Sequence, residues 1–231
     1  MSSFEDDHHE VEDFPPLEFA NEDGLLAIGG DLSPGRLIKA YQSGIFPWFN
    51  PGDPILWWSP DPRCVLYPDQ HRISRSTRKT IRSRGYVFSF DHAFDQVIHR
   101  CAGERRHQPG TWISEEMEIA YSTLHGMGVA HSVETWRDGL LVGGLYGIAL
   151  GGCFFGESMF SHERDASKAA LGYLVCHIKN WQFKLIDCQV TSDHLLTLGA
   201  EEVDRSVFKR HLDHALALEG RPGSWYGEGA L

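Results

Sequence analysis

The segment HSVETWRDGLLVGGLY, which runs from His131 to Tyr146, carries the strongest signal for the architecture of this chain. Two runs rich in apolar residues flank the dipeptide Asp138-Gly139, and both residues of that dipeptide tolerate a positive φ. A two-residue turn of this composition joins antiparallel strands whose twist it matches. The segment therefore predicts a β-hairpin.

The residues after the hairpin predict a strand, a long helix and another strand. The first strand passes through Phe154 and Phe155, and Asp165 can cap a helix that reaches about Asn180. The apolar run FKLIDCQV, residues 183–190, then predicts a strand, and Gly199 closes a further helix. A hairpin followed by a long helix and a strand is typical of acetyltransferase-like (GNAT-like) mixed α/β folds, with helices flanking one mixed sheet.

The chain before the hairpin divides by composition. Residues 1–23 predict an acidic disordered tail, residues 24–62 a small N-terminal domain rich in Gly, Pro and Trp, and residues 63–231 the acetyltransferase-like domain. Within residues 24–62, Ser33 can cap a helix over 34–41 that has Pro34 at its first position. Beyond residue 63 we expect strands at 64–67 and 86–90, a basic helix within 71–84, a helix at about 93–102, and a helix after Ser114.

The charge of the chain is unevenly distributed. The formal net charge is -11, but residues 1–23 hold nine acidic residues and no Lys or Arg, so the remainder carries 32 - 9 = 23 acids against 21 bases, or -2. No apolar run reaches the roughly 20 residues of a membrane helix, and the N-terminus lacks a basic, apolar signal sequence. Five cysteines without Cys-x-x-Cys spacing argue against both a disulfide framework and a zinc site. We therefore expect a cytoplasmic protein with reduced thiols and no membrane contact.

A basic run from His71 to Arg84 contains no acidic residue. It could be an ordinary solvated helix face, or its unbalanced charge could call for an anionic partner such as tRNA. On the second interpretation the residues that contact phosphates are Arg75, Arg78, Lys79, Arg82 and Arg84.

Asp187 and Gln189 lie two apart in the apolar run 183–190. Regular alternation along a strand would place both side chains on one face and Cys188 on the other. A carboxylate in a buried strand is costly unless it is paired, so the two residues form either a structural hydrogen bond within a core or part of a site. By the same alternation we expect Cys188 to be a small core residue rather than a nucleophile.

Several blocks of the chain resemble the leucyl/phenylalanyl-tRNA–protein transferases. The blocks are GIFPWF (44–49), WWSPDPR (57–63), GTWI (110–113), FGESMFS (155–161) and the strand with Asp187, and the similarity spans about residues 24–200. The resemblance implies a cytoplasmic enzyme that moves Leu or Phe, and Met as a further candidate, from aminoacyl-tRNA to proteins that begin with Arg or Lys. It also implies that this transfer marks the acceptor protein for degradation by the N-degron pathway.

The resemblance also implies roles for individual residues. Asp187 and Gln189 match the catalytic pair, in which Gln189 attracts a proton of the attacking amine and Asp187 supports it, and Glu157 is the second matching acid. The implied substrate-binding residues are Trp48 and Trp112 at the tRNA 3′ end and Leu145, Phe154, Met159 and Ile186 around the amino-acid side chain. Leu145 stands where the family can have Met and Ser192 where it can have Asn, so the resemblance does not determine the shape of the pocket or one local polar contact.

Two other functions compete with this interpretation. An acetyl-CoA-dependent N-acetyltransferase would need a Gln/Arg-x-x-Gly-x-Gly/Ala loop at a helix N-terminus, and the chain contains no such string. A module that only binds charged tRNA or basic N-termini would not need Asp187 beside Gln189. We expect a monomer that uses neither a cofactor nor a metal ion, since the histidines lack metal-ligand spacing.

Overall fold

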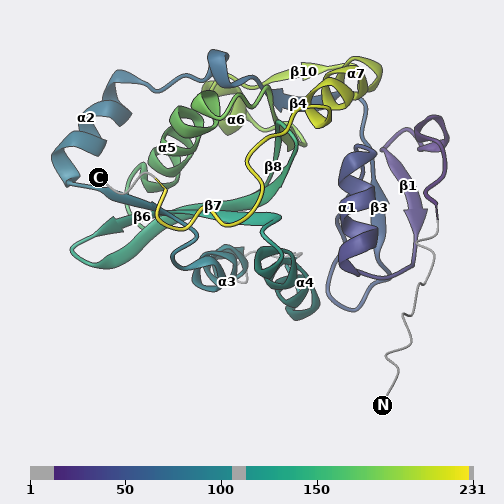
Figure 1. Ribbon diagram of the computed structural model, residues 1–231, viewed down its shortest axis with the longest axis horizontal. Coiled ribbons are helices and arrows are strands. Elements are labelled where there is room, and N and C mark those ends of the chain that lie inside the picture. Colours follow the sequence, from purple (N-terminus) through teal and green to yellow (C-terminus); the bar gives the residue numbers. More distant parts are fainter. Residues whose placement is uncertain (1–12, 106–112, 229–231) are drawn as a thin grey trace.

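The computed structural model describes residues 13–105 and 113–228, and it contains two sheets (Figure 1). The smaller sheet has three antiparallel strands in the order β1-β3-β2, formed by Leu25–Ile28 (β1), Phe46–Pro47 (β2) and Leu56–Trp58 (β3). Helix α1 (Pro34–Gln42) connects β1 to β2. As predicted, Pro34 opens this helix after Ser33, although the Ser33 side chain makes no capping hydrogen bond.

The larger sheet has seven strands in the order β10-β4-β9-β8-β7-β6-β5. Its strands are Arg63–Leu66 (β4), Val87–Phe90 (β5), Ala130–Arg137 (β6), Leu140–Leu150 (β7), Cys153–Ser161 (β8), Leu185–Gln189 (β9) and Glu201–Val203 (β10). All neighbouring pairs are antiparallel except β8 and β9, which are parallel. A mixed sheet with flanking helices is the predicted fold class.

The predicted hairpin joins β6 to β7. Asp138 and Gly139 form its turn with φ values of 50° and 75°, both positive as a two-residue turn of the primed type requires. Gly147 in β7 allows a close approach across the sheet, because a Cβ atom there would lie 2.1 Å from the Phe155 carbonyl oxygen.

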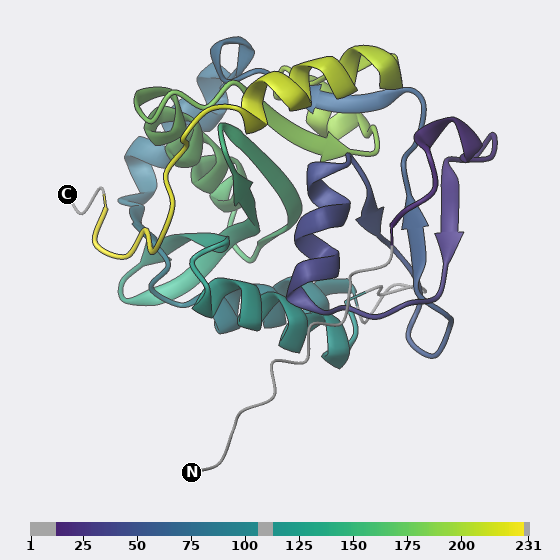
Figure 2. The same cartoon turned by 45° about the vertical axis from the view of Figure 1, so that its right-hand side comes forward.

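Helices cover both faces of the larger sheet (Figures 1 and 2). On one face α5 (Ala166–Asn180) packs against β6, β7 and β8 and contacts α2 (Arg75–Arg84). On the other face lie α3 (Phe94–Arg105), α4 (Glu115–Gly126) and α7 (Arg205–Leu216), and α1 contacts both α4 and α7. The short helix α6 (Asp193–Thr197) follows β9. Helix α1 therefore brings the N-terminal segment against the main sheet.

Most predicted elements occur within a few residues of their expected positions. Ser114 caps α4 by accepting the Met117 N–H, whereas Asp165 occupies the cap position of α5 but pairs with Lys168 instead. The strands of the smaller sheet, β10 and α7 were not predicted. No helix among the described residues is long and apolar enough to cross a membrane.

The disordered acidic tail predicted for residues 1–23 does not include residues 14–19, which have a defined structure. Phe14 packs its ring against Trp57 with the ring centroids 4.9 Å apart, and Leu17–Phe19 forms a short 3-10 helix. Residues 1–12 lie outside the described residues. Phe14 and Leu17 pack against the apolar core as partly buried residues, a contribution that the acidic composition of the segment concealed.

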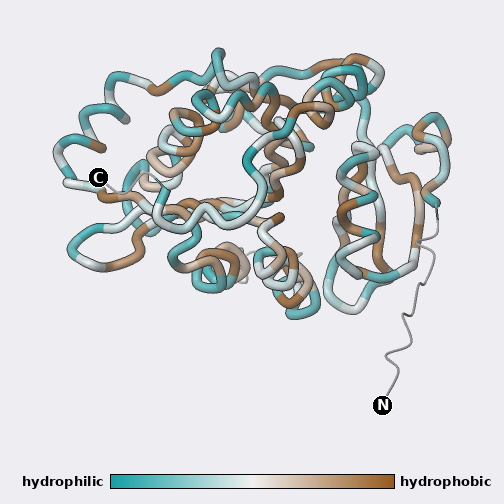
Figure 3. Tube along the Cα trace, in the orientation of Figure 1, coloured by the Kyte–Doolittle hydropathy of each residue, from teal (hydrophilic) through white to brown (hydrophobic). Residues whose placement is uncertain are grey.

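Polar and apolar segments separate along the chain (Figure 3). Helix α2 is largely hydrophilic, whereas the strands of the larger sheet are rich in buried apolar residues. Two large apolar clusters result. One lies under α1, α3, α4 and α7, and the other lies under α5.

Candidate active site

A cavity of about 370 Å³ opens where β2 meets β7, β8 and the end of β9. Its lining residues are Phe46, Pro47, Trp48, Leu145, Tyr146, Phe154, Gly156, Glu157, Ser158, Met159, Leu171, Ile186, Cys188, Gln189, Val190, Thr191, Ser192, His194 and Leu195. Both sheets and helix α6 contribute to it, so the cavity exists only when the N-terminal segment is packed against the larger sheet. Its residues divide into an apolar wall and a polar end.

The apolar wall contains all four side chains predicted to bind an amino-acid side chain. Leu145, Phe154 and Ile186 are almost fully buried, and Met159 is partly buried. Phe154 and Ile186 are paired across the parallel strands β8 and β9, which sends both to the α5 side of the sheet. An apolar wall of this kind favours an aliphatic or aromatic ligand, because a charged group would lose its hydration there.

The polar end of the cavity is centred on Glu157, which is 7% exposed. Across β7 and β8, Tyr146 faces Ser158 and Gly147 faces Gly156, so Glu157 is the extra residue of a β-bulge. Its Oε1 accepts hydrogen bonds from the Tyr41 hydroxyl (2.8 Å) and the Gln189 amide nitrogen (2.7 Å), and its Oε2 accepts one from the Tyr121 hydroxyl (3.0 Å). The bulge thus points the Glu157 carboxylate toward a group of hydrogen-bond donors from α1, α4 and β9.

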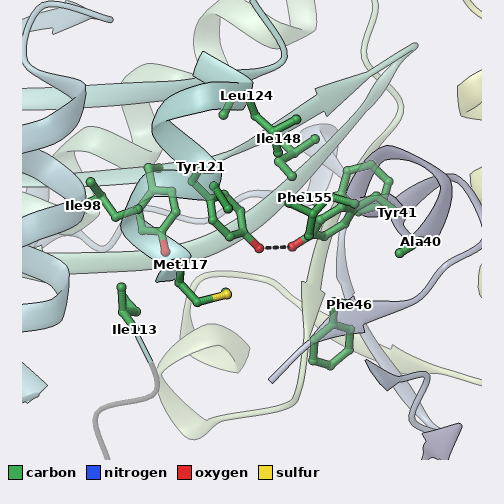
Figure 4. Close-up of a cluster of buried hydrophobic side chains, with 14 of the residues drawn as sticks. Ala40, Tyr41, Phe46, Ile98, Ile113, Met117, Tyr121, Leu124, Ile148 and Phe155 are labelled. Carbon is green, nitrogen blue, oxygen red and sulfur yellow. Dashed lines mark hydrogen bonds between the residues drawn. The ribbon is translucent and has the colours of Figure 1, made fainter. Parts of the chain in front are cut away.

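The two tyrosines meet at their hydroxyl groups (Figure 4). Both rings are fully buried and are surrounded by apolar side chains, including Phe155 and Ile148. Burial and the neighbouring Glu157 carboxylate raise the pKa of both Tyr41 and Tyr121 well above the usual range, so the two hydroxyls stay protonated. They are fixed hydrogen-bond partners for Glu157.

Burial also raises the pKa of Glu157, to about 7. The hydrogen bonds from Tyr41, Tyr121 and Gln189 oppose this rise by stabilising the charged form, and the nearby Asp187 carboxylate adds to it. Glu157 therefore changes its protonation near neutral pH, which is the range where an acid-base group in a site is most responsive.

The end of β9 departs from regular alternation at Gln189. The φ angle of Gln189 is 64°, and the Val190 N–H donates to the Cys188 carbonyl oxygen at 2.8 Å. These two features define a γ-turn of the rare, strained form. The turn redirects the Gln189 side chain into the cavity, beside Cys188 rather than opposite to it.

The predicted geometry of the Asp187 pair is therefore wrong in two respects. The Asp187 side chain is fully buried, does not line the cavity, and contacts Gln189 only through the Gln189 backbone N–H, which donates to Oδ1 at 2.9 Å. Glu157, not Asp187, holds the Gln189 carboxamide. Cys188 keeps the expected alternation, since it lies on the side of Ile186 and opposite to Asp187, but this is the side that faces the cavity, so Cys188 lines the cavity and is partly exposed instead of lying in the core. Its hydrogen bond with Cys64 and its burial raise the pKa of the Cys188 thiol well above the usual range, which disfavours a nucleophilic thiolate.

Asp187 is paired with Arg63, the first residue of β4. The guanidinium forms a fork, with Nε 2.8 Å from Oδ1 and Nη2 2.6 Å from Oδ2, and neither side chain is exposed. The Arg63 Cζ atom also lies 4.8 Å from the Phe46 ring centroid and 4.5 Å from that of Phe208. Breaking a buried pair of this kind by removing one partner costs about 3–5 kcal/mol.

The predicted nucleic-acid contacts lie outside the cavity or at its rim. Trp48 lines the cavity, is 44% exposed, and packs against Trp58 with ring centroids 6.0 Å apart. Trp112 lies outside the described residues. The basic side chains of α2, namely Arg75, Arg78, Lys79, Arg82 and Arg84, are all exposed. Arg84 is also paired with Glu163 at 3.0 Å, so it is partly neutralised.

Sequence reasoning missed Tyr41, Tyr121 and Arg63. Arg63 had a detectable signal, since it is a charged residue directly before the apolar strand 64–67 and closes the block WWSPDPR. The tyrosines had none, because each is one apolar-face position of an ordinary amphipathic helix. In the part of the chain that the structure describes, no group of His, Cys, Asp or Glu side chains is arranged to hold a metal ion.

Comparison with known proteins places the chain in a family. The family model described as leucyl/phenylalanyl-tRNA protein transferase matches residues 65–213, and the model of its N-terminal domain matches residues 30–61. The leucyl/phenylalanyl-tRNA–protein transferase of Cellvibrio japonicus is 59% identical over 204 residues, covering 87% of each chain. That of Nitrosomonas europaea is 57% identical over 215 residues, covering 92% of this chain and 91% of the relative.

Among solved structures, "The structure of L-PGS from Bacillus licheniformis" is 11% identical, covers 82% of this chain and 71% of that chain, and has a TM-score of 0.43. The sequence identity to the two transferases and the extent of the family match decide the family of this chain. The chain belongs to the leucyl/phenylalanyl-tRNA–protein transferase family.

Proposed function

We propose that this protein transfers leucine or phenylalanine from aminoacyl-tRNA to the α-amine of proteins that begin with Arg or Lys. Its relatives are named for aminoacyl transfer from tRNA to protein. The single observation that carries the proposal is the cavity itself, in which an apolar wall ends at the hydrogen-bonded pair of Glu157 and Gln189. A side chain can be held dry at one end while an ester carbonyl is presented to a polar group at the other.

The apolar wall supports leucine and phenylalanine as the transferred residues. Leu145, Phe154, Met159, Leu171 and Ile186 offer hydrocarbon and aromatic surface to the ligand. One methylene more or less in such a pocket changes binding by only about 1–3 kcal/mol, so methionine is a further substrate on this proposal.

The reaction is aminolysis of an ester. The α-amine nitrogen attacks the ester carbonyl carbon, a C–N bond forms, and the C–O bond to the terminal ribose breaks. The amine loses a proton, and the tRNA leaves with a free hydroxyl. An α-amine with a pKa of roughly 7.7 to 8 is partly neutral at physiological pH, so the main requirement is positioning rather than a strong base.

Gln189 supplies that positioning. The Gln189 amide nitrogen donates its hydrogen bond to Glu157. The Gln189 amide oxygen Oε1 accepts no hydrogen bond from the described residues. That oxygen can accept an N–H of the attacking amine and so direct the nitrogen lone pair at the carbonyl carbon. Glu157 maintains the orientation of the amide and adds negative charge near the amine.

The tRNA contacts follow from charge and exposure. The exposed basic face of α2 can neutralise phosphates of the tRNA body, and Trp48 offers an exposed ring at the rim of the cavity for a base of the 3′ end. We place Trp112 in the same role. On this proposal the enzyme acts as a monomer in the cytoplasm, where it marks its acceptors for N-degron degradation.

The test is an assay with radiolabelled leucyl-tRNA, without acetyl-CoA, ATP or added metal. Three acceptors that differ only at the N-terminus are compared: one beginning with Arg, one beginning with N-acetylated Arg and one beginning with Glu. We expect acid-stable label on the first alone, because the second lacks the nucleophile and the third lacks the basic side chain. Strict dependence on acetyl-CoA, or equal labelling of the Glu protein, would contradict the proposal.

A further inference from the structure

The buried pair of Arg63 and Asp187 is more elaborate than its position in the core requires. Two apolar side chains would fill the same space between β4 and β9 without the desolvation of two charges, and such replacements are often neutral or stabilising. Arg63 is instead held by a two-point fork to Asp187 and by the faces of Phe46 and Phe208. The pair therefore calls for an explanation other than stability.

The explanation lies in Asp187 Oδ1, to which both Arg63 and Gln189 donate a hydrogen bond. Asp187 Oδ1 accepts both the Arg63 Nε–H (2.8 Å) and the Gln189 backbone N–H (2.9 Å). Gln189 is the central residue of the strained γ-turn, with a φ of 64° that a non-glycine residue adopts rarely. Such strain persists at functional sites only when the surroundings over-determine it.

This γ-turn determines where the Gln189 carboxamide lies. Without the positive φ, Gln189 would follow the alternation of β9 and turn toward the side of Asp187, away from the cavity. With it, the carboxamide reaches Glu157 at 2.7 Å and lines the cavity.

We propose that Arg63 is a positioning residue for aminoacyl transfer, acting through Asp187 to hold the γ-turn that places the Gln189 carboxamide in the cavity. The inference rests on the proposed function and deepens it. Arg63 does not line the cavity, so its effect on the reaction passes through other residues. Phe46 both packs on Arg63 and lines the cavity, so the same stack joins the N-terminal sheet to the position of Gln189.

The experiment separates positioning from stability. Arg63→Met leaves Asp187 buried and unpaired, and it should lower both Tm and kcat. The double variant Arg63→Met/Asp187→Leu replaces both charges by apolar side chains, so its Tm should recover toward that of the wild type. Its kcat should stay about tenfold or more below the wild type, with KM for leucyl-tRNA within about twofold, because the turn no longer has its acceptor while the apolar wall is intact.

Arg36→Met provides the matched control. Arg36 is also a buried arginine stacked on two aromatic rings, with Cζ 4.7 Å from the Phe14 centroid and 5.4 Å from the Trp57 centroid, and it does not line the cavity. This variant should lower Tm and leave the kcat of the folded enzyme unchanged. A double variant at Arg63 and Asp187 that recovered both Tm and kcat would overturn the inference.

A milder variant covers the case in which the double variant does not fold. Arg63→Lys keeps the charge but cannot form the fork. Amide hydrogen exchange should become faster at Gln189, and kcat should fall with KM unchanged. Faster exchange at Gln189 together with an unchanged kcat would overturn the inference. Absence of transfer by the wild-type enzyme would instead be a failure of the proposed function, since it does not depend on any variant.

Discussion

Replacing Glu157 by Gln should remove a titration that affects both stability and turnover. The variant keeps the size of the side chain but cannot ionise, and its amide offers one acceptor oxygen and one donor NH2 where the carboxylate offers two acceptor oxygens. In the folded protein burial raises the pKa of Glu157 from 4.5 to about 7. A difference of about 2.5 pKa units corresponds to roughly 3 kcal/mol of free energy between the two protonation states.

The sign of the effect on stability follows from the direction of the shift. Because the folded-state pKa is raised, the stabilising contribution of Glu157 is fully present below its unfolded pKa, near 4.5, and is lost as the pH rises through 7. The free energy of unfolding of the wild type should therefore fall relative to that of Glu157→Gln by about 3 kcal/mol between about pH 4 and pH 8. Other titrating groups cancel in this difference.

Turnover should respond in the opposite direction. An ionised Glu157 accepts hydrogen bonds from Tyr41, Tyr121 and Gln189 together, whereas the protonated acid must donate at one of these positions. Below about pH 7 the wild-type rate should therefore depend on two protonations, those of Glu157 and of the acceptor amine, and log(kcat/KM) should approach a slope of about 2 against pH. Glu157→Gln should retain a slope of about 1, from the amine alone.

The measurements are urea unfolding curves and initial rates of labelled leucine transfer for both proteins, at matched pH values from about 4 to 9 for unfolding and about 5.5 to 9 for the rates. Equal limiting slopes of log(kcat/KM) would show that Glu157 does not titrate in the reaction. A pH-independent difference in unfolding free energy would refute the raised pKa itself.

Three further predictions concern single features of the site. Gln189→Ala should lower kcat by roughly ten- to hundredfold, the value of about 1 to 3 kcal/mol for a missing orienting hydrogen bond, with little change in the affinity for leucyl-tRNA measured by filter binding; full turnover would remove Gln189 from the site. Lys79→Ala/Arg82→Ala should weaken binding of intact tRNA and reduce the log-log salt slope by about 0.7 to 0.9 for each phosphate interaction that the substitutions remove, while a short aminoacylated 3′-end mimic is much less affected; equal weakening for the two ligands would make α2 an ordinary solvated face. Cys188→Ala should remain active in the transfer assay, because the raised pKa of the thiol leaves it protonated; an inactive but folded variant would revive the nucleophile interpretation.

The sequence by itself determined those features that depend on local chemistry. Asp138-Gly139 predicts the hairpin of β6 and β7 because few dipeptides adopt two successive positive φ angles, and Ser114 predicts the start of α4 because its hydroxyl accepts a backbone N–H. The apolar residues of the cavity wall were also identified, though through resemblance. Without it, Phe154 and Ile186 read as ordinary core residues.

The tertiary structure alone decided how the polar residues are used. Tyr41, Tyr121 and Glu157 are far apart in the sequence, and only the tertiary structure, in which α1 contacts α4 and both helices reach the β8 bulge, brings their oxygens within hydrogen-bonding distance. The pKa of Glu157 follows from the same burial. The alternation of β9 failed at Gln189 for a related reason: local propensity favours a regular strand, and contacts from distant residues, Arg63 through Asp187, stabilise a turn that the local sequence would not adopt.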